Sequence, residues 1–234
     1  MKWNEIYEYP TSTRALIKGA RHYTIDGQRK LPSVTTILSA TQSEEKKASL
    51  AKWRQNVGEN EAEQIKNTAA KRGTAMHSCL ESYINGIKTG KMSLDLTDIG
   101  REAMYMASQV IMHGLGSMEE IWGSEVTLYY PDLYAGATDL CGIYNDQPSI
   151  VDFKQSNKPK REEWIEDYFI QLAAYSLAHD HIYDTNTTQG VVLMCTPQGE
   201  FQRFTVDGQR FVDFKIKWLE RLDVYYKTHT TDAT

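Results

Sequence analysis

The segment SIVDFKQS, residues 149–156, has an apolar start and carries a carboxylate and an amine near its end. Alternate side chains of a strand share a face, so Asp152 and Lys154 would project together, roughly 7 Å apart at their Cα atoms, while Phe153 points the other way. Asp139 lies in the small-residue segment GATD just upstream. Two carboxylates on adjacent strands repel each other, and a divalent cation relieves that repulsion. The pattern therefore predicts an oxygen-rich metal site of the kind that Mg²⁺ favours.

Simpler interpretations exist for each of these residues. An Asp-x-Lys pair can be a surface ion pair with little effect on stability. His77, in RGTAMHSCLE, has Glu81 one helical turn later, but a single His is often a packed or exposed bystander. Gln171 and Tyr175 are also one turn apart; they could lie at a helix surface or core edge, or they could hold a phosphate or a base.

The first half of the chain is predicted to be mostly helical. PSVTTIL, from Pro32, is typical of a capped helix start, and residues 44–86 are helix-rich with breaks near Gly58 and Gly73. A further helix is expected over residues 98–113.

In the second half of the chain, the sequence pattern changes from one typical of helices to one typical of β-strands. SEVTLYYPD, YAGATDLCGIYN and SIVDFKQS are short runs rich in β-branched and aromatic residues, which predict a three-stranded meander. A helix is expected over residues 161–183, followed by two strands in GVVLMCTPQGEFQRFTV and a closing helix over residues 207–227. This order predicts an α/β domain with a mixed central sheet.

Charge is distributed unevenly around the net value of −5. Residues 1–73 hold 13 Lys and Arg against 8 Asp and Glu, whereas the rest of the chain holds 13 against 23. The first third could therefore meet an anionic partner while later carboxylates hold a cation, although both could equally be solvated surfaces. A uniformly basic DNA-coating protein is not indicated.

Basic residues and one tryptophan alternate in the predicted helices of the first third. This combination suits attraction to a nucleic-acid backbone together with stacking of single-stranded bases. The alternative is a solvated helix with the tryptophan in the core. The residues concerned are Lys46, Lys47, Lys52, Trp53, Arg54, Lys71 and Arg72.

Four motifs in chain order, RGTAMH, GATD, VDFK and QLAAY, resemble the motif series of RecB-type nucleases in the PD-(D/E)xK superfamily. LPSVTTIL and LAKWRQNVG resemble more narrowly the mitochondrial genome maintenance exonucleases and their phage and bacterial relatives. The resemblance extends over about residues 31–178. It implies a restriction-endonuclease-like α/β core with a mixed central sheet flanked by helices, plus an N-terminal helical region.

The resemblance also implies one nuclease domain over residues 1–234. A mostly helical, basic DNA-binding region would occupy residues 1–73, the nuclease core residues 74–227, and a flexible tail residues 228–234.

Site roles follow from the resemblance by position. His77, Asp139 and Asp152 would bind the metal with the Phe153 carbonyl, and Lys154 would join the two aspartates as a catalytic residue. Other residues are expected near the DNA or the cleft. Gln171, Tyr175, Trp53, Arg54, Arg72 and Lys158 are the candidate DNA contacts, and Glu81 and Glu125 are accessory candidates.

The implied function is a metal-dependent DNA exonuclease that hydrolyses phosphodiester bonds, prefers single strands with free ends, and acts in DNA degradation, repair, recombination or replication. Mg²⁺ is the expected ion, with Mn²⁺ able to substitute. No iron–sulfur cluster is expected, because the three widely spaced cysteines do not form the cluster-binding set of the nucleases that carry one.

Two alternatives remain open. One is a structure-specific or restriction-type endonuclease of the same fold, and the other is a noncatalytic nucleic-acid-binding module. The presence of Asp139, Asp152 and Lys154 favours an enzyme. DNA and RNA are not distinguished, because no motif reads the 2′ position.

No stretch approaches the roughly 20 apolar residues of a membrane-spanning helix, so no membrane partner is expected. The N-terminal segment MKWNEIYEYP has neither an apolar signal core nor an Arg-rich transit character. The prediction is a cytoplasmic protein of a bacterium or a phage-infected cell.

Overall fold

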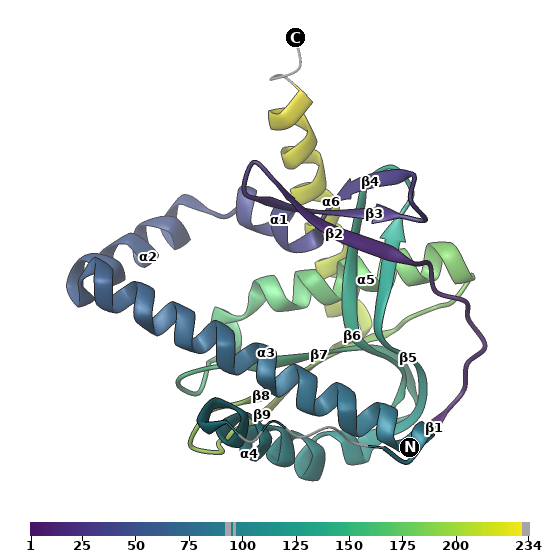
Figure 1. Cartoon of the computed structure of the whole chain (residues 1–234). Coiled ribbons are helices and arrows are strands. Elements are labelled where there is room, and N and C mark those ends of the chain that lie inside the picture. The colour runs from purple at the N-terminus through teal and green to yellow at the C-terminus, as the bar shows by residue number, and fades with distance from the viewer. Residues whose placement is uncertain (92–94, 96, 231–234) are drawn as a thin grey trace.

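A six-stranded mixed sheet forms the centre of the molecule, in the order β1-β5-β6-β7-β8-β9 (Figure 1). The computed structural model describes residues 1–91, 95 and 97–230. The strands of this sheet are β1 (Lys2–Trp3), β5 (Met118–Tyr130), β6 (Tyr134–Tyr144), β7 (Gln147–Gln155), β8 (Gln189–Cys195) and β9 (Phe201–Asp207).

The directions of the strands follow from their connections. Strands β5, β6 and β7 form the predicted antiparallel meander, and β8 and β9 form a hairpin. Strand β8 is parallel to β7, because helix α5 (Glu166–Tyr183) provides the crossover that a parallel pair needs. The expected mixed central sheet is confirmed.

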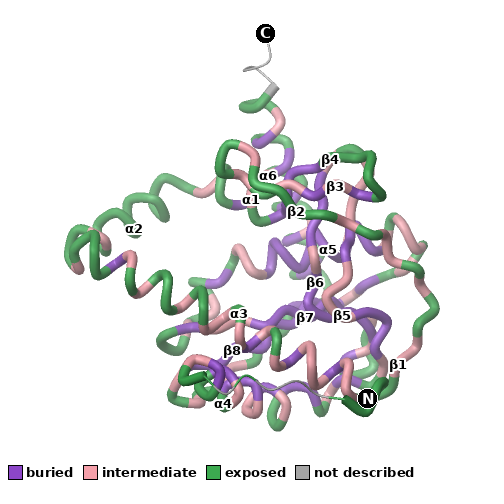
Figure 2. The backbone as a smooth tube through the Cα atoms, in the orientation of Figure 1, coloured by how far each residue is buried: buried purple, intermediate pink, exposed green. Residues whose placement is uncertain are grey.

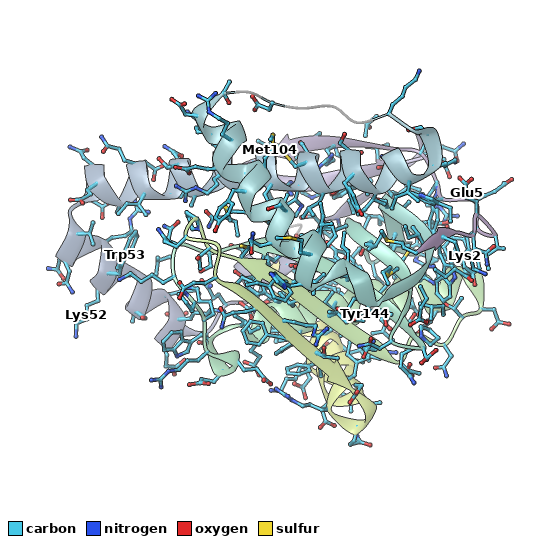
Figure 3. All side chains as sticks on the ribbon, turned by 90° about the horizontal axis from the view of Figure 1, so that it is seen from below. Lys2, Glu5, Lys52, Trp53, Met104 and Tyr144 are labelled. Atoms are coloured by element: carbon cyan, nitrogen blue, oxygen red, sulfur yellow. The ribbon has the colours of Figure 1, made fainter. Side chains whose placement is uncertain are left out.

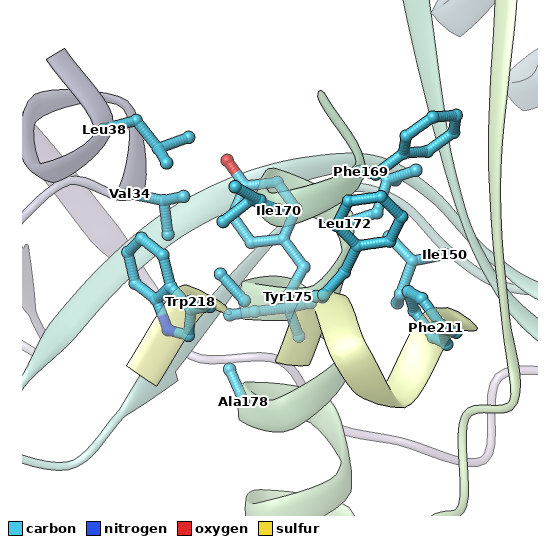
Figure 4. Close-up of a cluster of buried hydrophobic side chains, with 14 of the residues drawn as sticks. Val34, Leu38, Ile150, Phe169, Ile170, Leu172, Tyr175, Ala178, Phe211 and Trp218 are labelled. Carbon is cyan, nitrogen blue, oxygen red and sulfur yellow. The ribbon is translucent and has the colours of Figure 1, made fainter. Parts of the chain in front are cut away.

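Helices cover both faces of the sheet. Helices α5, α6 (Gly208–Thr230) and the short α1 (Val34–Ala40) pack on one face, while α3 (Glu59–Thr89) and α4 (Asp98–His113) pack on the other. Figure 4 shows the first of these two cores, in which side chains of α1, β7, α5 and α6 meet. This double cover explains why the central strands are almost continuously apolar.

The N-terminal third contains a second sheet, so the prediction that residues 1–73 are mostly helical is wrong in part. Strands β2 (Ser12–Ile17), β3 (Ala20–Ile25) and β4 (Arg29–Pro32) form an antiparallel three-stranded sheet, called here the small sheet. A two-residue turn joins β2 to β3, with φ of 50° at Lys18 and 79° at Gly19. Such a turn suits a tight hairpin, and the Lys-Gly dipeptide was a local signal for it.

The small sheet is attached to the central sheet by an apolar contact. Tyr23, Ile25 and Leu31 form a buried cluster with Ala135 at the start of β6. The predicted helix start after Pro32 follows directly, with Ser33 capping α1 by accepting a hydrogen bond from the Thr36 amide. The small sheet is therefore held beside the ends of β5 and β6 (Figure 1).

The predicted helix breaks have different outcomes. Helix α2 (Glu44–Val57) ends at Gly58 as expected, but α3 continues through Gly73. A glycine inside a helix costs about 1 kcal/mol. Burial of Met76, Leu80 and Ile84 on the same helix outweighs that cost, because these side chains anchor α3 to the sheet.

Two further predictions, the helix over residues 98–113 and the flexible C-terminal tail, can be compared with the structure. The helix over residues 98–113 is confirmed as α4. Helix α6 runs to Thr230, so residues 228–230 of the predicted flexible tail are helical. Residues 231–234 of that tail lie outside the described residues.

Helix α2, called here the α2 arm, projects away from the central sheet and contains no buried residue (Figures 1 and 2). Trp53 is 37% exposed, and Figure 3 shows it with Lys52 at the outer part of the arm. The interpretation of Trp53 as a core residue is therefore wrong. None of the helices described has the length and apolar character needed to cross a membrane.

Candidate active site

The predicted metal and catalytic residues line one cavity of about 440 Å³. Its walls come from the small sheet, α3, α5 and the strands β5, β6 and β7, of which β6 and β7 separate here. The predicted residues in the lining are His77, Glu81, Glu125, Asp139, Asp152, Lys154, Gln171 and Tyr175. Segments far apart in the chain thus bring eight of the predicted side chains to one place.

Strands β6 and β7 separate just before the two predicted metal carboxylates. Their register ends at the pair Leu140 and Val151, and beyond this point Asp139 Oδ2 accepts a hydrogen bond of 2.6 Å from the Phe153 amide. The N–H and C=O groups of a strand residue point to the same edge, so the Phe153 carbonyl also faces the Asp139 side. The Phe153 side chain is buried in the core on the opposite face, as predicted.

Asp152 is 3% exposed, so it is not part of a surface ion pair. Its Oδ2 atom is ion-paired with Lys154 Nζ, and its Oδ1 atom accepts a hydrogen bond of 3.3 Å from Gln171 Nε2. The Lys154 ammonium also lies 5.0 Å from the centre of the Tyr168 ring. The strand end therefore presents a carboxylate and an amine that are held by packing as well as by charge.

The charges at this strand end affect each other. Burial, with the Asp139 charge in support, raises the pKa of Asp152 despite the attraction of Lys154. Burial disfavours the Lys154 ammonium, but Asp152 and Asp139 outweigh burial and raise the pKa of Lys154. One lysine thus faces two carboxylates, and the carboxylate repulsion inferred from the sequence is present in the structure.

His77 joins the carboxylates from α3. Its Nδ1 atom lies 3.3 Å from Asp139 Oδ1 and 3.8 Å from Glu125 Oε1. Burial disfavours the charged imidazole, but Asp139 and Glu125 outweigh it and raise the pKa of His77 to about 10. Burial likewise opposes ionisation of Asp139, yet His77 and then Lys154 hold the pKa of this carboxyl below its usual value.

The donor set fits a divalent cation. His77, Glu125 and Asp139 each offer one ligand atom, and these atoms lie within 4.8 Å of one another. Asp152 Oδ2 is buried, and the Lys154 ammonium is its one polar partner among the described residues. Carboxylate oxygens with an imidazole suit Mg²⁺ or Mn²⁺ better than a thiolate-preferring metal.

Gln171 and Tyr175 are buried, with 8% and 3% of their surfaces exposed. Gln171 Nε2 lies 3.4 Å from the Tyr175 hydroxyl and also reaches Asp152. Tyr175 packs so closely on β6 at Gly136 that a Cβ at this glycine would lie 2.6 Å from the tyrosine ring. The pair therefore connects α5 to Asp152 and lines the cavity, and its predicted contact with DNA stays a prediction.

Glu81 and Glu125, the accessory candidates, differ in position. Glu81 lines the cavity, where burial and then the Glu125 charge raise its pKa. Glu125 lies within β5 but has a φ of 53°, a conformation that non-glycine residues adopt at a cost of about 1–3 kcal/mol. This backbone helps to place the Glu125 carboxylate near His77, a neighbour that its assignment as an accessory candidate did not specify.

The other predicted DNA contacts lie outside the cavity lining. Trp53 and Arg54 are on the α2 arm, and the Arg54 guanidinium binds Glu59 through hydrogen bonds of 2.9 and 2.7 Å. Arg72 donates hydrogen bonds to Glu102 and to Gln155 at the end of β7.

Lys158 is exposed in the loop after β7. Trp53 and Lys158 are thus accessible, whereas the guanidinium groups of Arg54 and Arg72 are used in contacts within the protein.

Sequence reasoning missed one wall of the cavity. Arg14, Arg21 and Tyr23 of the small sheet line it together with the carboxylates. Two turn dipeptides, Lys18-Gly19 and Asp26-Gly27, flank β3 and could have revealed this sheet.

Comparison with known proteins supplies an independent observation. No protein-family model matches the chain. A protein of Xenopus tropicalis named mitochondrial genome maintenance exonuclease 1 is 29% identical over 219 residues, which cover 89% of this chain and 60% of that protein. The chain is similar in sequence to mitochondrial genome maintenance exonucleases. This similarity confirms the resemblance predicted from the motifs.

The human protein of the same name is 25% identical over 206 residues, covering 83% of this chain and 58% of that protein. The chain therefore spans about 60% of the length of these mitochondrial genome maintenance exonucleases. Among solved structures, a putative exonuclease from Eubacterium rectale has a TM-score of 0.47 and 14% identity, with 68% of each chain covered.

Proposed function

We propose that this chain is a metal-dependent DNA exonuclease that hydrolyses phosphodiester bonds and prefers single strands with free ends. The observation that carries the proposal is the convergence of His77, Glu125, Asp139, Asp152 and Lys154 on one cavity. The similarity to mitochondrial genome maintenance exonucleases supports it, because the names of these relatives state an exonuclease activity. The restriction-endonuclease-like relationship of the core belongs to the same proposal.

The residues that would hold the ion are His77, Asp139 and Asp152, with the Phe153 carbonyl and with Glu125 close by. When bound, Mg²⁺, or Mn²⁺ in its place, supplies a Lewis acid for the phosphate and lowers the pKa of a water molecule. Gln171 keeps Asp152 oriented through its hydrogen bond to Oδ1. Glu125 adds a second carboxylate near His77, so we include it among the metal-binding candidates.

In the hydrolysis, the water oxygen forms a bond to phosphorus, the bond from phosphorus to the bridging sugar oxygen breaks, and a proton reaches that oxygen. Lys154 places its ammonium at the end of β7, beside Asp152, where it can orient the water or stabilise the charge that develops on the phosphate. The Asp139 contact with the Phe153 amide fixes β7 relative to β6, so these groups start the reaction in a defined arrangement.

The test is digestion of end-labelled linear and covalently closed circular single strands, beside duplex DNA and RNA, with Mg²⁺, Mn²⁺ or a chelator. We expect degradation of the linear single strand with either ion, none with the chelator, and intact circles. Cut circles would favour the endonuclease alternative. Binding of DNA without cleavage of any substrate would favour the noncatalytic module.

The cellular setting stays a prediction. A bacterial or phage origin was expected from the sequence, and the relatives above are named for a mitochondrial role.

A further inference from the structure

The small sheet contributes two arginines to the cavity that the carboxylates also line. Arg14 lies on β2 and Arg21 on β3, and both line the cavity together with Tyr23. Arg14 is the cross-strand partner of Tyr23, and Arg21 is two residues before it, so all three share one face of the sheet.

This face changes character along its length. Tyr23 and Ile25 are 3% and 1% exposed, because they pack in the cluster with Ala135 at the start of β6. Beside and beyond Tyr23, the same face carries the exposed residues Arg14, Arg21 and Leu16. The apolar half therefore fixes the sheet on the core, and the basic half extends over the cavity.

Neither guanidinium has a hydrogen bond or an ion pair with a residue that the structure describes. This distinguishes them from Arg54 and Arg72, whose guanidinium groups bind Glu59 and Glu102. The cavity is also lined by carboxylates: Asp139, Asp152 and Glu125 lie against His77, Lys154 or Gln171, and Glu81 lies near Glu125. The two guanidinium groups therefore line the cavity without a carboxylate partner among the residues that the structure describes.

We propose that Arg14 and Arg21 form a phosphate-binding subsite that holds a non-scissile phosphate of the DNA strand while the scissile phosphate lies at the carboxylate wall. The inference rests on the proposed function for the path of the strand. A guanidinium presents a planar fork of donors that matches phosphate oxygens. A strand that carries a phosphate at every nucleotide can occupy both walls at once, whereas a ligand with a single anion cannot.

The phosphate could be an internal diester or a terminal monoester. Both offer the same oxygens to the arginines, and the labelled strands described next separate them. In either case the subsite would set the register of the strand relative to the metal-binding residues.

The experiment measures binding of an internally labelled short single strand to the full chain, by fluorescence anisotropy in chelator across a series of salt concentrations. The variants are Arg14→Gln, Arg21→Gln and both together. Lys30→Gln is the matched control, because Lys30 pairs with Thr24 on the other face of the same sheet. Thermal unfolding of each variant checks the fold.

We expect each arginine variant to bind about 10-fold more weakly, which is the loss typical of one charge-assisted hydrogen bond. The slope of log affinity against log salt should also decrease by about 0.7 for each phosphate of the single strand that the variant no longer neutralises. The control should change neither quantity. If folded Arg14→Gln and Arg21→Gln proteins match the control in affinity and slope, the subsite is wrong.

Strands with a 5′ phosphate, a 3′ phosphate or only hydroxyl ends identify the phosphate. If the arginine variants lose affinity only for strands with one kind of phosphorylated end, the bound phosphate is a terminal monoester. If they lose affinity equally for all strands, it is an internal diester. The two proposals fail separately. A wild-type chain that binds through these arginines but never cleaves contradicts only the nuclease, while cleavage with arginine variants that bind like the control contradicts only the subsite.

Discussion

Strand β7 and the α2 arm carry the two groups of side chains from which the sequence suggested a nuclease, and they are built in opposite ways. In β7, Asp152 is 3% exposed and is held by Lys154 and Gln171. In the arm no residue is buried, and Trp53 is 37% exposed.

The difference corresponds to what each region is proposed to do. Hydrolysis requires atoms fixed within fractions of an ångström, so its groups are placed on packed strands and helices. Contact with a long flexible strand requires accessible surface, which an exposed helix provides. Variants in the two regions test this contrast.

Asp152→Asn should lower the rate of DNA cleavage by about 1000-fold or more, because several kcal/mol of transition-state stabilisation depend on the metal that this carboxylate is proposed to hold. The rate of degradation of an end-labelled single strand measures the effect. Asp207→Asn, at an exposed position at the end of β9, is the control and should retain activity. Full activity of a folded Asp152→Asn protein would remove β7 from the proposed chemistry.

Leu172→Ala should lower the free energy of unfolding by about 2–5 kcal/mol, because Leu172 is fully buried on α5 and its removal leaves a cavity. The matched variant Leu50→Ala on the α2 arm should change it by less than about 0.5 kcal/mol, since Leu50 is 51% exposed. Urea denaturation measures both. Comparable losses would show that the arm packs as tightly as the core.

His179→Gln should reduce the loss of stability in acid. His179 is buried against Tyr9 and Thr185, and burial lowers its pKa from 6.5 to about 4, although Asp180 opposes the shift. The folded state therefore favours the neutral imidazole, so its contribution is complete above pH 6.5 and declines as the pH falls towards 4, by up to about 3 kcal/mol.

Urea denaturation at pH 7.5 and pH 4.5 measures this effect of His179. The wild-type chain should lose more stability between the two values than the variant does. An equal loss in both proteins would assign the acid sensitivity to other groups.

Trp53→Ala should weaken binding of single-stranded DNA by about 10-fold without changing its salt dependence, because removing one base-stacking interaction costs about 1–3 kcal/mol and involves no counterion. Its free energy of unfolding should stay within about 0.5 kcal/mol of wild type. Tyr105→Ala, at a half-exposed aromatic residue of α4, is the control. If the two variants bind equally well, the arm does not contact the bases.

The candidate active site was largely predictable because its signals are local. The strand-like segments that became β5, β6 and β7 can be recognised in the residue order. The i, i+2 spacing that places Asp152 and Lys154 on one face of β7 can be recognised there too. The helix over residues 98–113 was predicted for the same reason. The small sheet was the main feature that was not predicted. The first third was expected to be helical, so the two hairpin turns that flank β3 were not recognised.

The residue order alone specified the residue types of the site, the order of its motifs and the side of the strand from which each group projects. These properties depend only on neighbouring residues within one element. The packing of the folded chain established which elements meet. It placed Glu125 beside His77, buried Gln171 and Tyr175, left Trp53 exposed, and brought Arg14 and Arg21 to the cavity that Asp152 lines. These outcomes depend on how the small sheet and α3 pack on the central sheet, and distances between separate elements are not contained in any local pattern.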